Sequence, residues 1–309
     1  MPVTEFKGVA VKPTKTGLTM IELLVVLGII VLLVGLLVPA LSTVRNIAKE
    51  TKQKAQFSTI EMALVAFKND RGDFPPSNWT PAPFTGDYCG AQKLAEALVG
   101  WDLLGFHPKS VWRADGLDAD GGPTTYDPGQ TRDDNGDTNP DTFDERKGPY
   151  LQHATTNAFR LGNIFANNPG ELADTSPLRA DTFVLCDVFG SKKISMPDGT
   201  IVNAGAPILY FKADTTAKTI RGIYRIVDNE AIVVIKQQSD GQIHPLVDPT
   251  NAYQFFYGNN DPVDNIVGYI EDQKINAKIW PYRPDSYILI SAGADGLYGT
   301  PDDIKNFGN

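Results

Sequence analysis

The chain has 309 residues, which leaves room for about two domains. With 42% hydrophobic and 21% charged residues, its composition excludes collagen-like, coiled-coil and wholly disordered chains. The net charge of −9 argues against a nucleic-acid-binding protein, which needs a basic face to neutralise phosphates. A slightly negative mean hydropathy excludes several membrane spans, although it allows one.

The N-terminus combines a short basic segment with a long apolar one. Residues 1–17 carry three lysines against one acid, and residues 18–41 are apolar except for Glu22 and a few small or polar positions. At 1.5 Å per residue the apolar segment can span a hydrocarbon core of about 30 Å. The lysines before it place the N-terminus in the cytoplasm, although the basic residues between Arg45 and Lys54 weaken this orientation. We therefore predict a single-pass membrane protein with the remaining chain outside.

The boundary between the two segments reads Gly17-Leu18-Thr19-Met20-Ile21-Glu22. This motif resembles the processing site of type IV prepilins and type II secretion pseudopilins, although the family usually has Phe where this chain has Leu18. The resemblance implies that a prepilin peptidase cleaves after Gly17 and methylates the new amino group of Leu18. It also implies that Glu22 pairs with the Leu18 amine of a neighbouring subunit, which offsets the burial of both charges. A partly solvated acid near the membrane interface is the alternative role of Glu22.

The apolar pattern continues beyond the span at spacings of three and four residues, the period of one helical face. This stripe comprises Val44, Ile47, Phe57, Ile60, Leu64 and Phe67. Gly72, followed by Pro75 and Pro76, predicts the end of the helix. We therefore expect one helix from Leu18 to about Asp70, and residues 42–76 contain its amphipathic half, which packs on a globular head.

Residues 77–180 are predicted to be a loop-rich insertion with short helices, one of them at residues 92–99. Residues 113–147 carry ten acids against four bases, so we expect a solvated loop there. Within it, residues 133–144 place oxygen-bearing side chains in an EF-hand-like register but lack the turn glycine and the final glutamate. An acidic loop is therefore favoured over a calcium site in this segment.

Residues 181–309 contain short runs of β-branched and aromatic residues separated by turn residues, which predicts an antiparallel sheet. The expected strands are residues 182–189, 206–211, 219–227, 231–235 and 287–291. A long helix packed on such a sheet gives the predicted fold class, which is α+β and pilin-like.

The C-terminal tail contains Ser-Ala-Gly-Ala-Asp at residues 291–295, a glycine-rich turn, and Asp-Ile-Lys-Asn at residues 303–306. It resembles the C-terminal loop of the major, G-type pseudopilin, which binds calcium. The resemblance implies calcium ligands at Asp295 and Asp303, with Asp302 as an additional acid. Calcium takes six to eight oxygen ligands, and a glycine-turned loop can supply carbonyls as well as carboxylates. A hydrophilic terminal turn without metal is the alternative.

Chemical motifs are few elsewhere in the chain. His107, His153 and His244 lie in no motif that pairs a histidine with a nucleophile or a metal, so we interpret them as ordinary surface or core residues. Cys89 and Cys186 are compatible with one disulfide in an oxidising compartment, and equally with two unpaired thiols.

We therefore expect a structural subunit of a type II secretion pseudopilus, not an enzyme, anchored in the inner membrane with its head in the periplasm. The partners that the resemblance implies are prepilin peptidase, other copies of the chain, minor pseudopilins and the inner-membrane assembly platform; nucleic acid is not expected. The long region at residues 77–180 favours a minor pilin of an adhesion or DNA-uptake pilus as an alternative. A membrane-anchored extracytoplasmic binding protein is the alternative from a different class.

Overall fold

The computed structural model describes a large part of the chain. The described residues are 17, 19–79, 87–117, 125–126, 145–152, 156–165, 172, 177–190, 192–195, 199–259, 266–275 and 277–308. The chain divides into two compact units, Met1–Ala48 and Lys49–Asn309, and the first helix contributes residues to both.

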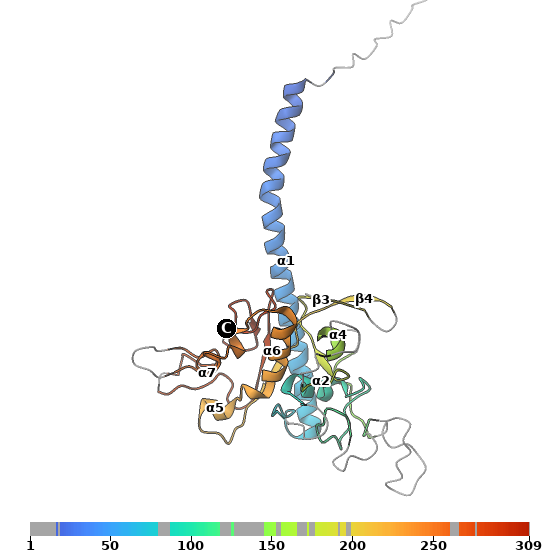
Figure 1. The fold of residues 1–309 in the computed structure, drawn as a ribbon, viewed down its shortest axis with the longest axis vertical. Helices are drawn as coiled ribbons and strands as arrows, with labels where there is room; N and C mark the ends of the chain where they lie inside the picture. The colour runs from blue at the N-terminus through green and yellow to red at the C-terminus, as the bar shows by residue number, and fades with distance from the viewer. Residues whose placement is uncertain are drawn as a thin grey trace, which may run out of the picture. The chain divides into compact units, whose positions relative to one another are not determined.

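That helix, α1 (Met20–Arg71), has 52 residues and confirms the predicted long N-terminal helix (Figure 1). It ends where the sequence predicts. Gly72 has a φ of +86° and donates its N–H to the carbonyl of Lys68 at 2.7 Å. Glycine reaches this left-handed conformation without the steric penalty that a side chain would cause, so it terminates the helix cleanly.

The remaining elements are short helices and strands (Figure 1). In chain order they are α2 (Gly90–Val99), β1 (Ala158–Arg160), α4 (Leu161–Phe165), β2 (Phe183–Leu185), β3 (Lys192–Ser195), β4 (Ile201–Ala204), β5 (Leu209–Lys212), α5 (Ile220–Ile223), α6 (Val227–Asp240), the 3₁₀ helix η2 (Pro245–Val247), α7 (Ala252–Tyr257), β6 (Tyr287–Ser291) and β7 (Ile304–Lys305). The strands pair antiparallel as β1–β2, β3–β4 and β5–β6–β7. The α+β class is therefore confirmed, although the described strands form three small sheets instead of one.

Two of the predicted strands are wrong, because residues 219–227 contain α5 and residues 231–235 lie inside α6. Their β-branched residues suggested strands, but the buried positions of α6 follow a helical period, with Asp228 and Ile232 four residues apart on one face. Gly241, with a φ of +70°, caps the helix by donating its N–H to the carbonyl of Gln237 at 2.9 Å. Tertiary burial of one helical face outweighs the local strand preference.

The sheet β5–β6–β7 is the central layer of the Lys49–Asn309 unit. Alternate residues of a strand point to opposite faces, and each face of this sheet builds its own core. Tyr210 and Leu289 belong to a cluster with α1 and α2, which includes Phe57, Ile60, Leu64, Phe67, Leu94 and Leu98. Phe211 and Ile290 belong to a second cluster, with Ile232, Val233 and Ile235 of α6. The amphipathic half of α1 therefore packs on one face of the sheet and α6 on the other.

The region predicted as a loop-rich insertion contributes to the core more than expected. All ten residues of α2 are buried, and the helix packs against β2 and β5. The described residues within 113–147 include a buried tyrosine, Tyr126, whose hydroxyl donates to the buried Glu96 carboxylate at 2.7 Å. The expectation of a solvated loop is therefore wrong for this part, because a buried carboxylate needs hydrogen-bond donors. The EF-hand-like residues 133–144 lie outside the described residues.

Candidate functional site

The start of α1 is stabilised by the same two residues that define the processing motif. Thr19 precedes the first helical residue, and its hydroxyl oxygen accepts a hydrogen bond from the backbone N–H of Glu22 at 3.3 Å. In return, the Glu22 carboxylate accepts hydrogen bonds from the backbone N–H and the hydroxyl of Thr19, both at 2.8 Å. This reciprocal arrangement is a capping box, which satisfies backbone donors that a helix start leaves unpaired. The spacing of Thr and Glu therefore has a local structural role.

Gly17 lies before the helix, exposed and in non-helical backbone. A Cβ placed on it would meet no atom within 4 Å, and its φ does not require glycine. Among the residues that the structure describes, no contact explains the glycine. Leu18, the predicted first residue after cleavage, lies outside the described residues.

Among the described residues, α1 is the single helix long and apolar enough to cross a membrane. Its apolar window is not buried within the chain; Leu24, for example, is 71% exposed. This exposure distinguishes the segment from the core helix of a soluble protein, whose apolar residues are mostly buried. A contiguous exposed apolar surface of this length indicates contact with lipid or with another protein.

The amphipathic half of α1 is attached to the head by three polar side chains on one face. Lys49 Nζ donates to the carbonyl of Phe189 at 3.1 Å, and Gln56 Nε2 donates to the carbonyl of Cys186 at 2.9 Å. Between them, Gln53 Oε1 accepts the backbone N–H of Val188 at 2.9 Å. Residues 49, 53 and 56 share a helix face, so they bind the backbone of residues 186–189 in register.

The C-terminal loop between β6 and β7 is organised around Asp302. Its Oδ2 accepts the backbone N–H groups of Ala294 at 2.7 Å and Asp295 at 2.9 Å, and its Oδ1 accepts the Thr300 hydroxyl at 2.6 Å. Asp295 Oδ1 in turn accepts the backbone N–H of Leu297 at 2.7 Å. Burial, together with the neighbouring Asp302 carboxyl, raises the pKa of Asp295. Asp302, which had no assured counterpart in the resembled family, is thus the acid beside Asp295.

Asp303 joins the C-terminal loop to Tyr269, a residue outside the loop. Its Oδ2 accepts the backbone N–H of Gly299 at 2.8 Å and the hydroxyl of Tyr269, while its buried Oδ1 has no hydrogen-bond partner within the described part of the chain. Burial raises the pKa of Asp303 to about 7.

The three acids named by the calcium prediction are therefore not arranged as one centre. Over the residues that the structure describes, no three His, Cys, Asp or Glu side chains are grouped so that they could hold a metal ion. The unpartnered Oδ1 of Asp303 is a suitable oxygen donor, but the donor set as it stands does not fit a shared ion, which needs six to eight oxygens.

Calcium binding stays a prediction of the resemblance, and a melting experiment tests it. An ion that binds only the folded chain stabilises it by about 2.7 kcal/mol when its concentration is a hundredfold above Kd. The full chain in detergent should therefore melt at a higher temperature in millimolar calcium than in chelator. Asp295→Asn and Asp303→Asn should remove this increment, whereas Asp248→Asn, at a half-buried acid outside the loop, should retain it. Equal melting temperatures in calcium and chelator would contradict the prediction.

The last residues of the chain lock the tail to α1, a role that the motif Asp-Ile-Lys-Asn did not reveal. Asn306 Oδ1 accepts the backbone N–H of Leu289 in β6 at 2.8 Å, and Asn306 Nδ2 donates to Glu61 Oε1 in α1 at 3.0 Å. Arg283 Nη1 donates to the same Glu61 oxygen at 2.6 Å and to the Asn306 carbonyl at 3.2 Å. One asparagine thereby joins the central sheet to the helix.

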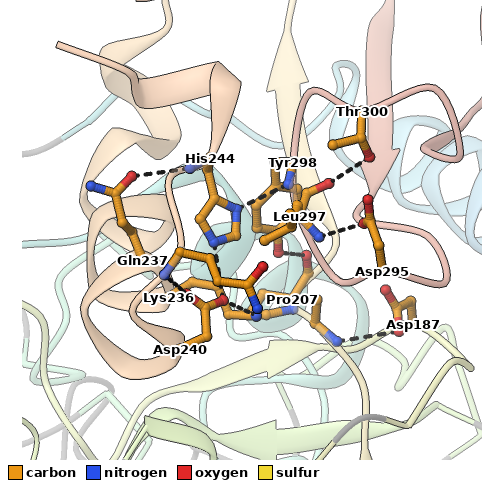
Figure 2. A network of polar contacts seen from close by, with 12 residues as sticks. Asp187, Pro207, Lys236, Gln237, Asp240, His244, Asp295, Leu297, Tyr298 and Thr300 are labelled. Atoms are coloured by element: carbon orange, nitrogen blue, oxygen red, sulfur yellow. Dashed lines mark hydrogen bonds and ion pairs between the residues drawn. The ribbon is translucent and has the colours of Figure 1, made fainter.

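A buried polar network centred on His244 lies beside the C-terminal loop (Figure 2). His244 is fully buried, and its neighbours come from α6 and from the loop. The interpretation of His244 as a core residue is confirmed, and so is that of His107, which is 3% exposed; His153 lies outside the described residues. A lone histidine carries no spacing signal, so the sequence could not show that His244 binds the loop.

The two cysteines, Cys89 and Cys186, are both buried and both free. Burial raises the pKa of each thiol, to about 11 for Cys89. The sequence allows either a disulfide or two unpaired thiols, and the structure has two unpaired thiols.

Models of protein families, curated protein sequences and solved structures contain no match to this chain. The functional assignment therefore depends on the residues and their geometry.

Proposed function

We propose that the chain is a prepilin-like structural subunit of a type II secretion pseudopilus. In this proposal the N-terminal half of α1 anchors the chain in the inner membrane, and the α+β head lies on the periplasmic side. Prepilin peptidase removes residues 1–17, and the mature chain assembles with other copies and minor pseudopilins on an inner-membrane platform. The chain acts by assembly and carries out no catalysis.

The observation that carries the proposal is the geometry of the processing motif. Gly17 is exposed in non-helical backbone, and the apolar helix begins at Met20 behind the capping pair of Thr19 and Glu22. The predicted cleavage point after Gly17 therefore lies before the helix, which starts three residues later. Because the cleavage point comes before the capped start of α1, removal of the leader leaves the helix intact. The exposed apolar window of α1 supports the anchoring and assembly that follow.

Co-expression with a prepilin peptidase tests the proposal through the intact mass of the membrane-extracted chain. The wild-type chain should lose residues 1–17 and gain one methyl group, whereas Gly17→Leu should keep its leader. Because a Cβ at Gly17 meets no atom, this substitution blocks the enzyme without straining the chain. Gly28→Ala, at a glycine of α1 that is equally open, is the matched control and should be processed normally. A wild-type chain that still begins at Met1 beside an active peptidase would refute the proposal.

A further inference from the structure

His244 binds the C-terminal loop directly through one ring nitrogen. Its Nδ1 accepts the backbone N–H of Tyr298 at 2.9 Å, and the backbone N–H of Leu246, two residues after the histidine, donates to the Tyr298 carbonyl at 3.3 Å. The Tyr298 hydroxyl also donates to the carbonyl of Pro207, as Figure 2 shows. Tyr298 is fully buried, so these contacts fix the middle of the loop at residues 292–303.

The second ring nitrogen of His244 faces Asp240 at the end of α6. The distance from Nε2 to Asp240 Oδ2 is 3.1 Å, and Lys236 Nζ lies 2.6 Å from the same oxygen. Because Nδ1 accepts a backbone N–H, it carries no proton, and Nε2 therefore carries the proton of a neutral imidazole and donates it to Asp240. The backbone N–H of His244 is held separately, by Gln237 Oε1 at 3.1 Å.

A second proton could bind His244 only at Nδ1, where it would face the N–H of Tyr298. The hydrogen bond would then be replaced by two opposed donors. The surroundings of the ring have opposite effects on its pKa. The carboxylates of Asp240 and Asp295 favour a charged imidazole, whereas Lys236 and burial disfavour it. Burial is the largest of these effects and lowers the pKa of His244 below its ordinary value.

We propose that His244 is an acid-sensitive latch on the C-terminal loop: the neutral imidazole holds the loop through Tyr298, and protonation of Nδ1 releases it. At neutral pH the closed latch keeps the acidic turn of Asp295 and Asp302 ordered. In an acidic compartment the released loop exposes this turn. The latch does not depend on whether the chain assembles into a filament, because all of its members lie in the head.

The sign of the pH dependence follows from the two states of the loop. In the released loop the histidine has its ordinary pKa of about 6.5, whereas the latched state binds the proton more weakly. The latch is therefore fully closed above about pH 6.5 and weakens as the pH falls from there toward the lowered pKa. One proton changes the opening equilibrium by at most about tenfold per pH unit.

Hydrogen exchange of the Tyr298 and Leu246 amides in the full chain, in detergent with chelator, tests the proposal. His244→Asn is the matched variant, because its Oδ1 takes the place of Nδ1 as an acceptor and does not titrate. Protection of the two amides should be similar in both chains at pH 7.5. By pH 5 the wild type should lose protection relative to the variant, by up to about thirtyfold, because one proton changes the equilibrium by at most about tenfold per pH unit below 6.5. A ratio that stays constant with pH would overturn the proposal.

A measurement on the native histidine keeps the test valid if His244→Asn does not fold. Ring-nitrogen NMR should show His244 neutral, with its proton on Nε2, at pH 7.5, and with a midpoint below 6.5. His107 is also buried and accepts a backbone N–H at Nδ1, so His107→Gln is used to assign the signals. A His244 that is charged at pH 7.5, or protonated on Nδ1, would contradict the latch.

Discussion

Glu22→Gln should insert into the membrane and lose its leader as the wild type does, yet form at least tenfold fewer filaments. Glutamine keeps the shape of the side chain and can still accept the Thr19 N–H, so the capping box at the start of α1 survives. It lacks the charge that, in the proposed filament, pairs with the Leu18 amine of a neighbouring subunit. That amine would be left in an apolar bundle without a counter-ion, which is strongly unfavourable.

The complementary variant separates the cap from the charge. Thr19→Val removes the hydroxyl that accepts the Glu22 N–H and leaves the carboxylate in place. Loss of a cap costs about 1 kcal/mol of helix stability, so assembly of this variant should be close to normal.

Filament yield after shearing, measured beside the intact mass of the membrane fraction, distinguishes the two roles. If Glu22→Gln forms normal filaments while Thr19→Val does not, the pair serves to cap the helix and the proposed intersubunit ion pair is wrong. Normal filament yield from both variants would show that assembly needs neither the helix cap nor the ion pair.

Leu64→Ala should lower the free energy of unfolding of the head by about 2–5 kcal/mol, which is a large part of the stability of an ordinary domain. Leu64 is fully buried in the cluster between α1 and the central sheet. Truncating it removes apolar contacts and leaves a cavity that the packed helix cannot close.

The next residue along the helix provides the control. Val65 is 50% exposed, so Val65→Ala removes little buried surface and places a better helix former in α1. Denaturant unfolding of the full chain in detergent should show the loss for Leu64→Ala and a change within about 0.5 kcal/mol for Val65→Ala. Similar losses from both variants, or from neither, would show that this half of α1 does not pack on the head as described.

The elements that could be predicted from the sequence are those whose signals agree. The end of α1 combines an apolar stripe, Gly72 and two prolines, and the strand β6 combines an apolar run with flanking turn residues. Helix α6 was missed because its valines and isoleucines suggest a strand, while the signals for a helix are the spacing of its buried face and the cap at Gly241. Asp228 and Glu230 lie in its first turn, where acids suit the start of a helix.

For the sites, contacts between residues close in sequence could be predicted, and contacts between distant residues could not. Thr19 and Glu22 are three residues apart, so their interaction could be anticipated from spacing alone. The contacts of Asp303 with Tyr269, and of His244 with Tyr298, join residues distant in sequence. Only the folded chain brings them together, and no local pattern encodes them. The position of Asp302 beside Asp295 depends likewise on how the glycine-rich loop turns.

The junction at Asn306 has a consequence for the order in which the protein is made. Glu61 is 222 residues from Arg283 and 245 residues from Asn306 along the chain, yet it binds both. Contacts of such separation form late, because most of the chain must first be brought together. The apolar stripe of Phe57, Ile60 and Leu64 has its complete partner surface only after the segment that contains Ile304 has been synthesised. In the proposed membrane protein, the N-terminal segment therefore reaches the membrane before the head is complete, and the apolar stripe is exposed to aggregation during that interval.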